Sequence, residues 1–223
     1  MHAVRIWDLP TRVFHWSLTV CVVGLLITGT VGGGWLEWHL RFGYSVMTLL
    51  LFRLAWGFVG GHWSRFGNFV YGPASLRSYL GGRAQVEHMA GHNPLGALAV
   101  FALLLALLAQ VGSGLISDDE IATFGPLVRF VSGDTVSAAT AYHKNVGKLL
   151  ILSLVGIHLM AIAVYTFVKR QALTRAMVTG DKMLAAPVTP VRDTVSTRIL
   201  ALGILLACAL LVRWVVGLGQ VVF

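Results

Sequence analysis

The fold follows from residues 143–168, which read HKNVGKLLILSLVGIHLMAIAVYTFV. About 20 apolar residues cross the ~30 Å hydrocarbon core of a membrane as a helix. This run is longer than that, and its charged residues, Lys144 and Lys148, lie near its start. It also contains two histidines, His143 and His158. Because an ionisable side chain within a membrane span is costly, it indicates a functional site. The run therefore predicts a membrane-spanning helix with two imidazoles that bind something.

Four more runs have the length and apolar character of membrane spans, namely residues 13–31, 42–60, 95–117 and 197–217. The whole chain agrees, since 57% of its residues are hydrophobic and 12% are charged, whereas a soluble domain has about 25% charged residues. The first run lacks a small-residue cleavage site, so we expect it to be retained rather than removed as a signal peptide. The predicted fold class is all-α, an integral membrane helical bundle with five spans.

Basic residues gather in alternate connections between the spans. The N-terminal segment and the connections at residues 61–94 and 169–196 hold most of the lysines and arginines. Because cytoplasmic loops carry an excess of these residues, we expect a cytoplasmic N-terminus and a C-terminus on the opposite side. The net charge of +8 then reflects membrane topology. Nucleic-acid binding is not indicated, because the chain has no recognition motif and no dense basic run.

The histidines fall at two depths in such a topology. His15 and His158 lie near cytoplasmic ends of spans, whereas His39 and His143 lie at opposite ends. His158 follows His143 by 15 residues, which at ~1.5 Å per residue separates the two levels by ~22 Å. At ~100° per residue the two side chains point within ~60° of each other around the helix, so both can face the bundle interior. The four histidines thus form two pairable sets and suggest two bound irons.

Both histidines on the far side are followed by glycine four residues later, as His39 is by Gly43 and His143 by Gly147. A glycine one turn from a ligand removes side-chain bulk where a flat ring must approach the helix. The same arrangement at both histidines of one level indicates that this level binds a planar macrocycle.

The chain resembles the bacterial cytochrome b561 and Ni,Fe-hydrogenase-type cytochrome b family. The resemblance covers roughly residues 4–182 and rests on the order and flanks of several pieces rather than on one motif. The matching pieces are WDLPTRVFHW at residues 7–16; His39 with Gly43, Arg53, Trp56 and Gly57; Arg65-Phe66 through Gly72-Pro73; GHNPLG at residues 91–96; His143 with Gly147 and His158; and RAMVTG at residues 175–180.

This resemblance implies a four-helix core that holds two non-covalent haems b, each between two histidines. His15 and His158 would hold the cytoplasmic-side haem, and His39 and His143 the far-side haem. Residues 1–182 would form this di-haem domain, and residues 183–223 a linker with an additional C-terminal transmembrane helix. The family usually has 14 residues between the two histidines of the fourth span, and this chain has 15. A π-bulge eased by Gly156 would absorb the extra residue.

Each haem also brings two propionates, which require cations or solvent. Arg12 is a candidate partner on the cytoplasmic side, with Arg53 as a deeper one. On the far side the candidates are Arg41, Lys144 and Lys148.

Bis-histidine ligation fills both axial positions of an iron, which suits single-electron transfer rather than substrate chemistry. The resemblance therefore implies transmembrane electron transfer between a periplasmic redox partner and the membrane quinone pool, in a bacterial inner membrane with a periplasmic C-terminus. The partner would be a c-type cytochrome, a dehydrogenase or a hydrogenase, with this chain as the cytochrome b subunit. Contacts with membrane lipid are expected, and a homodimer is compatible with this arrangement.

Two other functions stay open at this point. One is a stand-alone cytochrome b of the same fold that oxidises superoxide or a quinol at a haem edge. The other is a haem-free divalent-metal transporter that uses the same imidazoles, a reading that the scarcity of carboxylates in the spans disfavours. The sequence contains no catalytic dyad or phosphate-binding loop that would indicate an enzyme of another kind.

Overall fold

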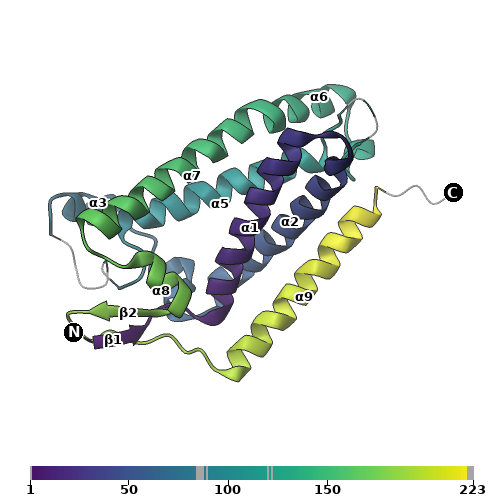
Figure 1. The fold of residues 1–223 in the computed structure, drawn as a ribbon. Helices are drawn as coiled ribbons and strands as arrows, with labels where there is room; N and C mark the ends of the chain where they lie inside the picture. The colour runs from purple at the N-terminus through teal and green to yellow at the C-terminus, as the bar shows by residue number, and fades with distance from the viewer. Residues whose placement is uncertain (1, 84–87, 89, 120, 122, 220–223) are drawn as a thin grey trace. The chain divides into compact units, whose positions relative to one another are not determined.

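The computed structural model describes residues 2–83, 88, 90–119, 121 and 123–219. In this part of the chain five helical stretches are long and apolar enough to cross a membrane (Figure 1). They are Leu9–Val31, Gly33–Val59, Pro94–Leu115, Gly133–Val168 and Val195–Gly217. The prediction of an all-α, multi-pass membrane protein with five spans is confirmed.

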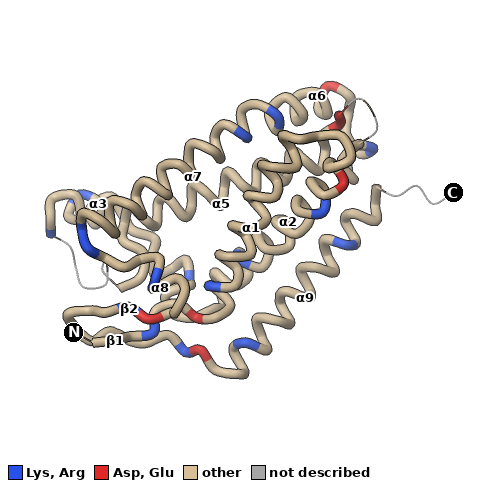
Figure 2. The backbone as a smooth tube through the Cα atoms, in the orientation of Figure 1, with Lys and Arg blue, Asp and Glu red and all other residues tan. Residues whose placement is uncertain are grey.

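Each of the first, second, third and fifth spans contains one α-helix. Helix α1 is Leu9–Val31, and a 3-10 turn at Gly33–Trp35 leads into α2, Leu36–Val59. Helix α5 is Pro94–Leu115 and α9 is Val195–Gly217. Helix α5 carries no charged residue along its length (Figure 2), as expected for a helix in hydrocarbon. Arg53 in α2 and Arg213 in α9 are charged residues within spans, and each therefore needs a partner or a route to the surface.

The fourth span differs from its predicted form at two places. It begins with α6, Gly133–Ala141, ten residues before the predicted start, and Ser132 caps this helix by accepting a hydrogen bond from Thr135 N. A π-helical segment, Tyr142–Gly147, joins α6 to α7, Lys148–Ala163, and a second one covers Val164–Val168. The predicted π-bulge is therefore present in this span, but around His143 rather than at Gly156. The start was missed because α6 is rich in small and polar residues and lacks an apolar run.

The chain divides into two compact units, and the division falls across the spans. The first unit comprises Met1–His15, Arg53–Leu103 and Leu154–Leu202. The second comprises Trp16–Phe52, Leu104–Ser153 and Gly203–Phe223. His15 and His158 belong to the first unit, and His39 and His143 to the second.

In the first unit a small two-stranded sheet joins the N-terminal segment to the connection after the fourth span. Strand β1, His2–Arg5, pairs antiparallel with β2, Asp181–Leu184, so that Val4 lies opposite Lys182. Helix α8, Leu173–Thr179, precedes β2 and ends at Gly180, whose φ of 91° suits glycine. Side chains from both strands join a buried cluster with residues of the connections between spans, namely Val4, Ile6, Trp7, Trp63, Ala90, Ala176, Leu184 and Val191.

Asp8 fixes the start of α1 in this unit. Its carboxylate is fully buried and accepts a hydrogen bond from Thr11 N at 2.8 Å, as an N-cap does. Ser64 Oγ donates to the same carboxylate at 2.9 Å, and Trp56 Nε1 at 3.3 Å. The WDLPTR piece therefore begins the helix that carries His15, and it fastens this helix to the end of α2. The short helix α3, Pro73–Leu80, follows in the next connection.

Candidate haem-binding sites

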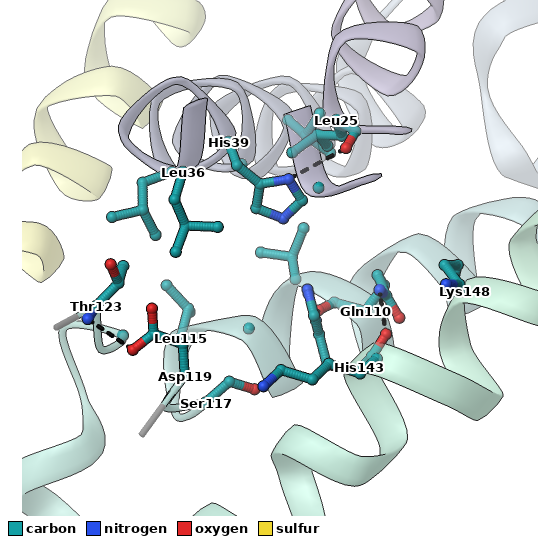
Figure 3. A pocket seen from close by; sticks show the side chains of 18 of the residues that line it. Leu25, Leu36, His39, Gln110, Leu115, Ser117, Asp119, Thr123, His143 and Lys148 are labelled. Atoms are coloured by element: carbon teal, nitrogen blue, oxygen red, sulfur yellow. Dashed lines mark hydrogen bonds between the residues drawn. The ribbon is translucent and has the colours of Figure 1, made fainter. Parts of the chain in front are cut away.

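His39 and His143 face each other in the second unit. His39 lies in α2 and His143 in the π-helical segment before α7. Their ring centroids are 6.1 Å apart, and the ring planes are nearly perpendicular, at 83°. Both side chains line one cavity (Figure 3).

A backbone carbonyl orients each of these rings through its Nδ1 atom. His39 Nδ1 lies 3.1 Å from Leu25 O, and His143 Nδ1 lies 2.9 Å from Gln110 O. Because a carbonyl oxygen accepts only, each Nδ1 carries the hydrogen and donates it. The lone pair of each imidazole is then on Nε2. A histidine that ligates a metal usually has this arrangement, with its other ring nitrogen donating to a carbonyl or carboxylate.

The surroundings of the two rings follow the same pattern. Three residues after each carbonyl comes a hydroxyl, Thr28 or Ser113, whose oxygen is 3.4 or 3.3 Å from Nδ1. Four residues after each carbonyl, and directly after the hydroxyl residue, comes a glycine. A Cβ at Gly29 or Gly114 would lie 2.9 or 2.8 Å from the ring Cε1. Sequence reasoning missed these residues, although the shared spacing of a hydroxyl and a glycine in two spans was a usable signal.

The separation of the rings fits one iron between them. An imidazole nitrogen binds a metal at about 2 Å, and the ring centre lies about 1.2 Å behind that nitrogen. Two imidazoles on opposite sides of one metal therefore have centroids about 6.4 Å apart, and the observed distance is 6.1 Å. The donor set thus suits the axial ligands of a haem.

The cavity between the rings has a volume of about 510 Å³ and mostly apolar walls, within the usual range of roughly 300–1,000 Å³ for cofactor sites. Gly43 lines it, and a Cβ there would meet nothing within 4 Å. Gly147 is placed differently, since a Cβ there would overlap the side-chain oxygen of Gln110. Gly43 therefore leaves room beside the cavity, whereas Gly147 makes room for Gln110.

The cations predicted for the far-side propionates are also placed differently from one another. Lys144 and Lys148 line the cavity. Arg41 does not, because its guanidinium pairs with Glu37 and lies over the Trp38 ring, 5.0 Å from the centroid. The two lysines are the cations that can reach a group inside the cavity.

The second histidine pair belongs to the first unit. His15 lies in α1 and His158 in α7, and the two are close enough for a charge on one to act on the other. His92, just before α5, lies within electrostatic range of both. Its ring lies against Trp7 and Phe69, at centroid distances of 4.8 and 4.5 Å.

Two cations, Arg53 and Lys182, lie near His92. Arg53 is 3% exposed, and its guanidinium lies over the Phe66 ring, 4.5 Å from the centroid. Lys182 Nζ donates to Ala90 O at 3.3 Å, and burial lowers its pKa to about 8. Burial, together with the charges of Arg53 and Lys182, lowers the pKa of His92 to about 3, so that His92 is neutral at physiological pH.

Arg12, the other predicted partner on this side, is already engaged by the protein. Its Nη1 donates to Val178 O at 2.6 Å. Its Nη2 lies 3.9 Å from the carboxylate of Asp193, which is 4% exposed. These contacts tie the start of α1 to α8 and to the segment before α9.

The residues that the structure describes include no group of three or more His, Cys, Asp or Glu side chains that could hold a metal ion. A transport site for a divalent metal needs several such ligands, whereas a haem iron takes two from the protein. The imidazole pairs are thus better suited to a haem iron, whose porphyrin ring supplies the other ligands.

A helical membrane protein with paired imidazoles on either side of an apolar cavity of this size has the characteristics of a membrane b-type cytochrome, whose cofactor is haem b. The comparisons agree, since the profile of prokaryotic cytochrome b561 matches residues 6–180. The chain belongs to the prokaryotic cytochrome b561 family.

Similar proteins of known name are subunits of larger enzymes. A probable Ni/Fe-hydrogenase B-type cytochrome subunit of Azotobacter chroococcum mcd 1 is 29% identical, over 81% of this chain and 89% of its own length. One of Bradyrhizobium diazoefficiens is 24% identical, over 80% and 85%. The probable Ni/Fe-hydrogenase 1 B-type cytochrome subunit of Escherichia coli K12 is 27% identical, over 49% and 57%. No solved structure matches the chain significantly.

Proposed function

We propose that this protein carries electrons across a bacterial inner membrane through two haems b, one held by His15 and His158 and the other by His39 and His143. The observation that supports this most directly is the geometry of His39 and His143. Their rings are separated by the distance that one iron requires, and each Nδ1 is used by a carbonyl, which leaves Nε2 for the metal.

The protein's own groups prepare these sites for electron transfer. A haem b supplies a one-electron redox couple when it is bound. Each imidazole pair would hold one iron from two sides and would leave no position on it for a substrate. The hydrogen bonds from Nδ1 to Leu25 O and Gln110 O hold the rings in place and raise the basicity of Nε2, which favours the oxidised metal. Lys144 and Lys148 are suited to bind the propionates of this haem.

The proposed topology places the N-terminus in the cytoplasm and the C-terminus in the periplasm, with residues 1–182 as the di-haem domain and 183–223 as linker and fifth helix. We further propose that a hydrogenase, or another periplasmic redox protein, exchanges electrons with the quinone pool through this chain. The names of the relatives support a hydrogenase. A homodimer stays a prediction.

The test is a reduced-minus-oxidised spectrum of the purified chain with a pyridine haemochrome count, repeated for His15→Ala and His143→Ala. The expected result is two haems b in the unmodified chain and one in each variant, with different absorption and potential in the two. A colourless protein that binds zinc or nickel would contradict the proposal and favour metal transport. Superoxide or quinol oxidation by the isolated chain would instead identify a stand-alone enzyme.

A further inference from the structure

Three nitrogen-bearing side chains gather in the first unit, and one of them, His92, lies within electrostatic range of His15 and His158. Arg53 comes from α2, His92 from the turn before α5, and Lys182 from β2. Arg53 and Lys182 both act electrostatically on His92. We call these three residues the basic cluster. They are far apart in sequence, and the fold brings Arg53 and Lys182 near His92, which is itself near the proposed haem ligands.

The donors of the basic cluster are incompletely satisfied. Arg53 Nη1 and His92 Nδ1 are buried and have no hydrogen-bond partner among the described residues. Lys182 Nζ donates to a carbonyl, Ala90 O, rather than to a carboxylate. Buried cations and buried donors are normally paired, because an unpaired buried charge costs several kcal/mol. The cluster is therefore built to receive an acceptor that none of the described residues supplies.

Among the described residues, the carboxylate of Asp8 cannot take this role. Asp8 acts electrostatically on Arg53. However, it already accepts hydrogen bonds from Thr11 N, Ser64 Oγ and Trp56 Nε1. Its charge offsets one cation, and the second, Lys182, forms no ion pair with a carboxylate in the part of the chain that the structure describes. The missing group must therefore be negatively charged as well as an acceptor.

From this geometry we infer that the basic cluster binds a carboxylate, namely a propionate of the haem between His15 and His158. The cluster has this role only if those histidines hold a haem, as proposed above. A carboxylate offers about four acceptor positions on two oxygens, enough for the free donors of Arg53, His92 and Lys182. Arg12, the partner expected from the sequence, has two of its three nitrogens, Nη1 and Nη2, engaged by Val178 O and Asp193.

The first test removes one cation at a time. Arg53→Gln and Lys182→Gln should each lower the midpoint potential of one haem only, because a cation beside a propionate disfavours the oxidised iron. Each should also speed loss of that haem about tenfold, as expected for a charge-assisted hydrogen bond. Arg77→Gln, an exposed residue of α3 in the same unit, is the control and should change neither quantity. Lys182 lies on a half-buried strand, so its variant remains informative if Arg53→Gln fails to fold.

The second test identifies the anion. In a His143→Ala background, which keeps only the haem in question, the full chain is loaded with haem or with haem dimethyl ester, which lacks the propionate charges. The ester should bind about tenfold more weakly than haem, and Lys182→Gln should weaken haem but not the ester further. Equal binding of both compounds, or additive losses, would overturn the inference and indicate another anion, such as a lipid phosphate. Absence of haem from the unmodified chain would refute the proposed function instead.

Discussion

At the scale of single residues, the glycines beside the imidazole rings are as informative as the histidines. Gly29 and Gly114 leave no room for a Cβ beside His39 and His143. Gly43 instead faces open space in the cavity wall. A small residue in a transmembrane helix thus has two separate uses here, one that positions an imidazole and one that leaves space for a ring.

This difference gives a test with a matched control in one helix. Gly114→Ala should displace the His143 ring, because its Cβ would lie 2.8 Å from Cε1, and overpacking of this kind costs roughly 1–3 kcal/mol. We expect most of the haem of the second unit to be lost and the other haem to be kept. Gly112→Ala has nothing within 4 Å of its Cβ and should retain both. Spectroscopic haem counts decide, and equal counts in the two variants would contradict this role.

At the scale of elements, the π-helical segment explains the unusual histidine spacing. In an α-helix one extra residue rotates everything beyond it by about 100°. Tyr142–Gly147 is wound more widely, so it takes in an extra residue without that rotation. His143 lies within this segment, and its ring still meets His39.

Deletion variants test this explanation. Deleting Val146, which is 60% exposed within the π-helical segment, should turn the segment into ordinary α-helix, restore a spacing of 14, and keep both haems. Deleting Gly156, which lies in the regular α-helix Lys148–Ala163, should rotate one ligand away by about 100° and lose one haem. Haem content and thermal stability in detergent are the measurements. If both deletions behave alike, the π-helical segment does not absorb the residue.

At the scale of the whole chain, the segment between the fourth and fifth spans is more than a linker. Leu184 and Val191 belong to the buried cluster of the first unit. Asp193 accepts hydrogen bonds from Leu9 N at 3.2 Å and from Arg198 Nε at 2.8 Å. The start of α1 and the start of α9 are therefore joined through one carboxylate.

Asp193 gives this junction a pH dependence. Burial acts to raise the pKa of Asp193, but hydrogen bonds from Arg198 and Leu9 N leave it below 3.8. A carboxylate with a depressed folded-state pKa stabilises the protein fully above its unfolded value and loses this effect as the pH falls through the folded value. Asp193→Asn should thus lower the free energy of unfolding by about 1–3 kcal/mol near pH 7 and flatten its dependence below about pH 4.

The measurement is denaturant unfolding in detergent at pH values on either side of about 4. Asp181→Asn is the control, because the carboxylate of Asp181 is 43% exposed and an exposed pair contributes roughly 0–1 kcal/mol. A larger loss in the control than in Asp193→Asn would show that the junction is not held by the buried carboxylate.

The sequence was sufficient to predict the spans, because apolar length is a local signal, and it was sufficient to select the four histidines as candidates, because a costly polar residue in a span is one too. It was insufficient for the contacts that join distant segments. Arg53 and Lys182 are far apart in the chain, and the carbonyl of Gln110 has no side-chain signature. The start of α6 was also unreadable, because its small polar residues gain helical stability from a cap and from continuation into α7.

The repeated arrangement around His39 and His143 also bears on how the protein is made. In each case the imidazole and the carbonyl that orients it come from consecutive spans, α1 with α2 and α5 with the fourth span. Each helical hairpin can therefore set its own ligand during insertion into the membrane, before the other hairpin has been synthesised. Binding of the cofactor then requires only that the two formed hairpins associate. Much of the entropy cost of ordering the imidazoles has by then been met as each hairpin formed.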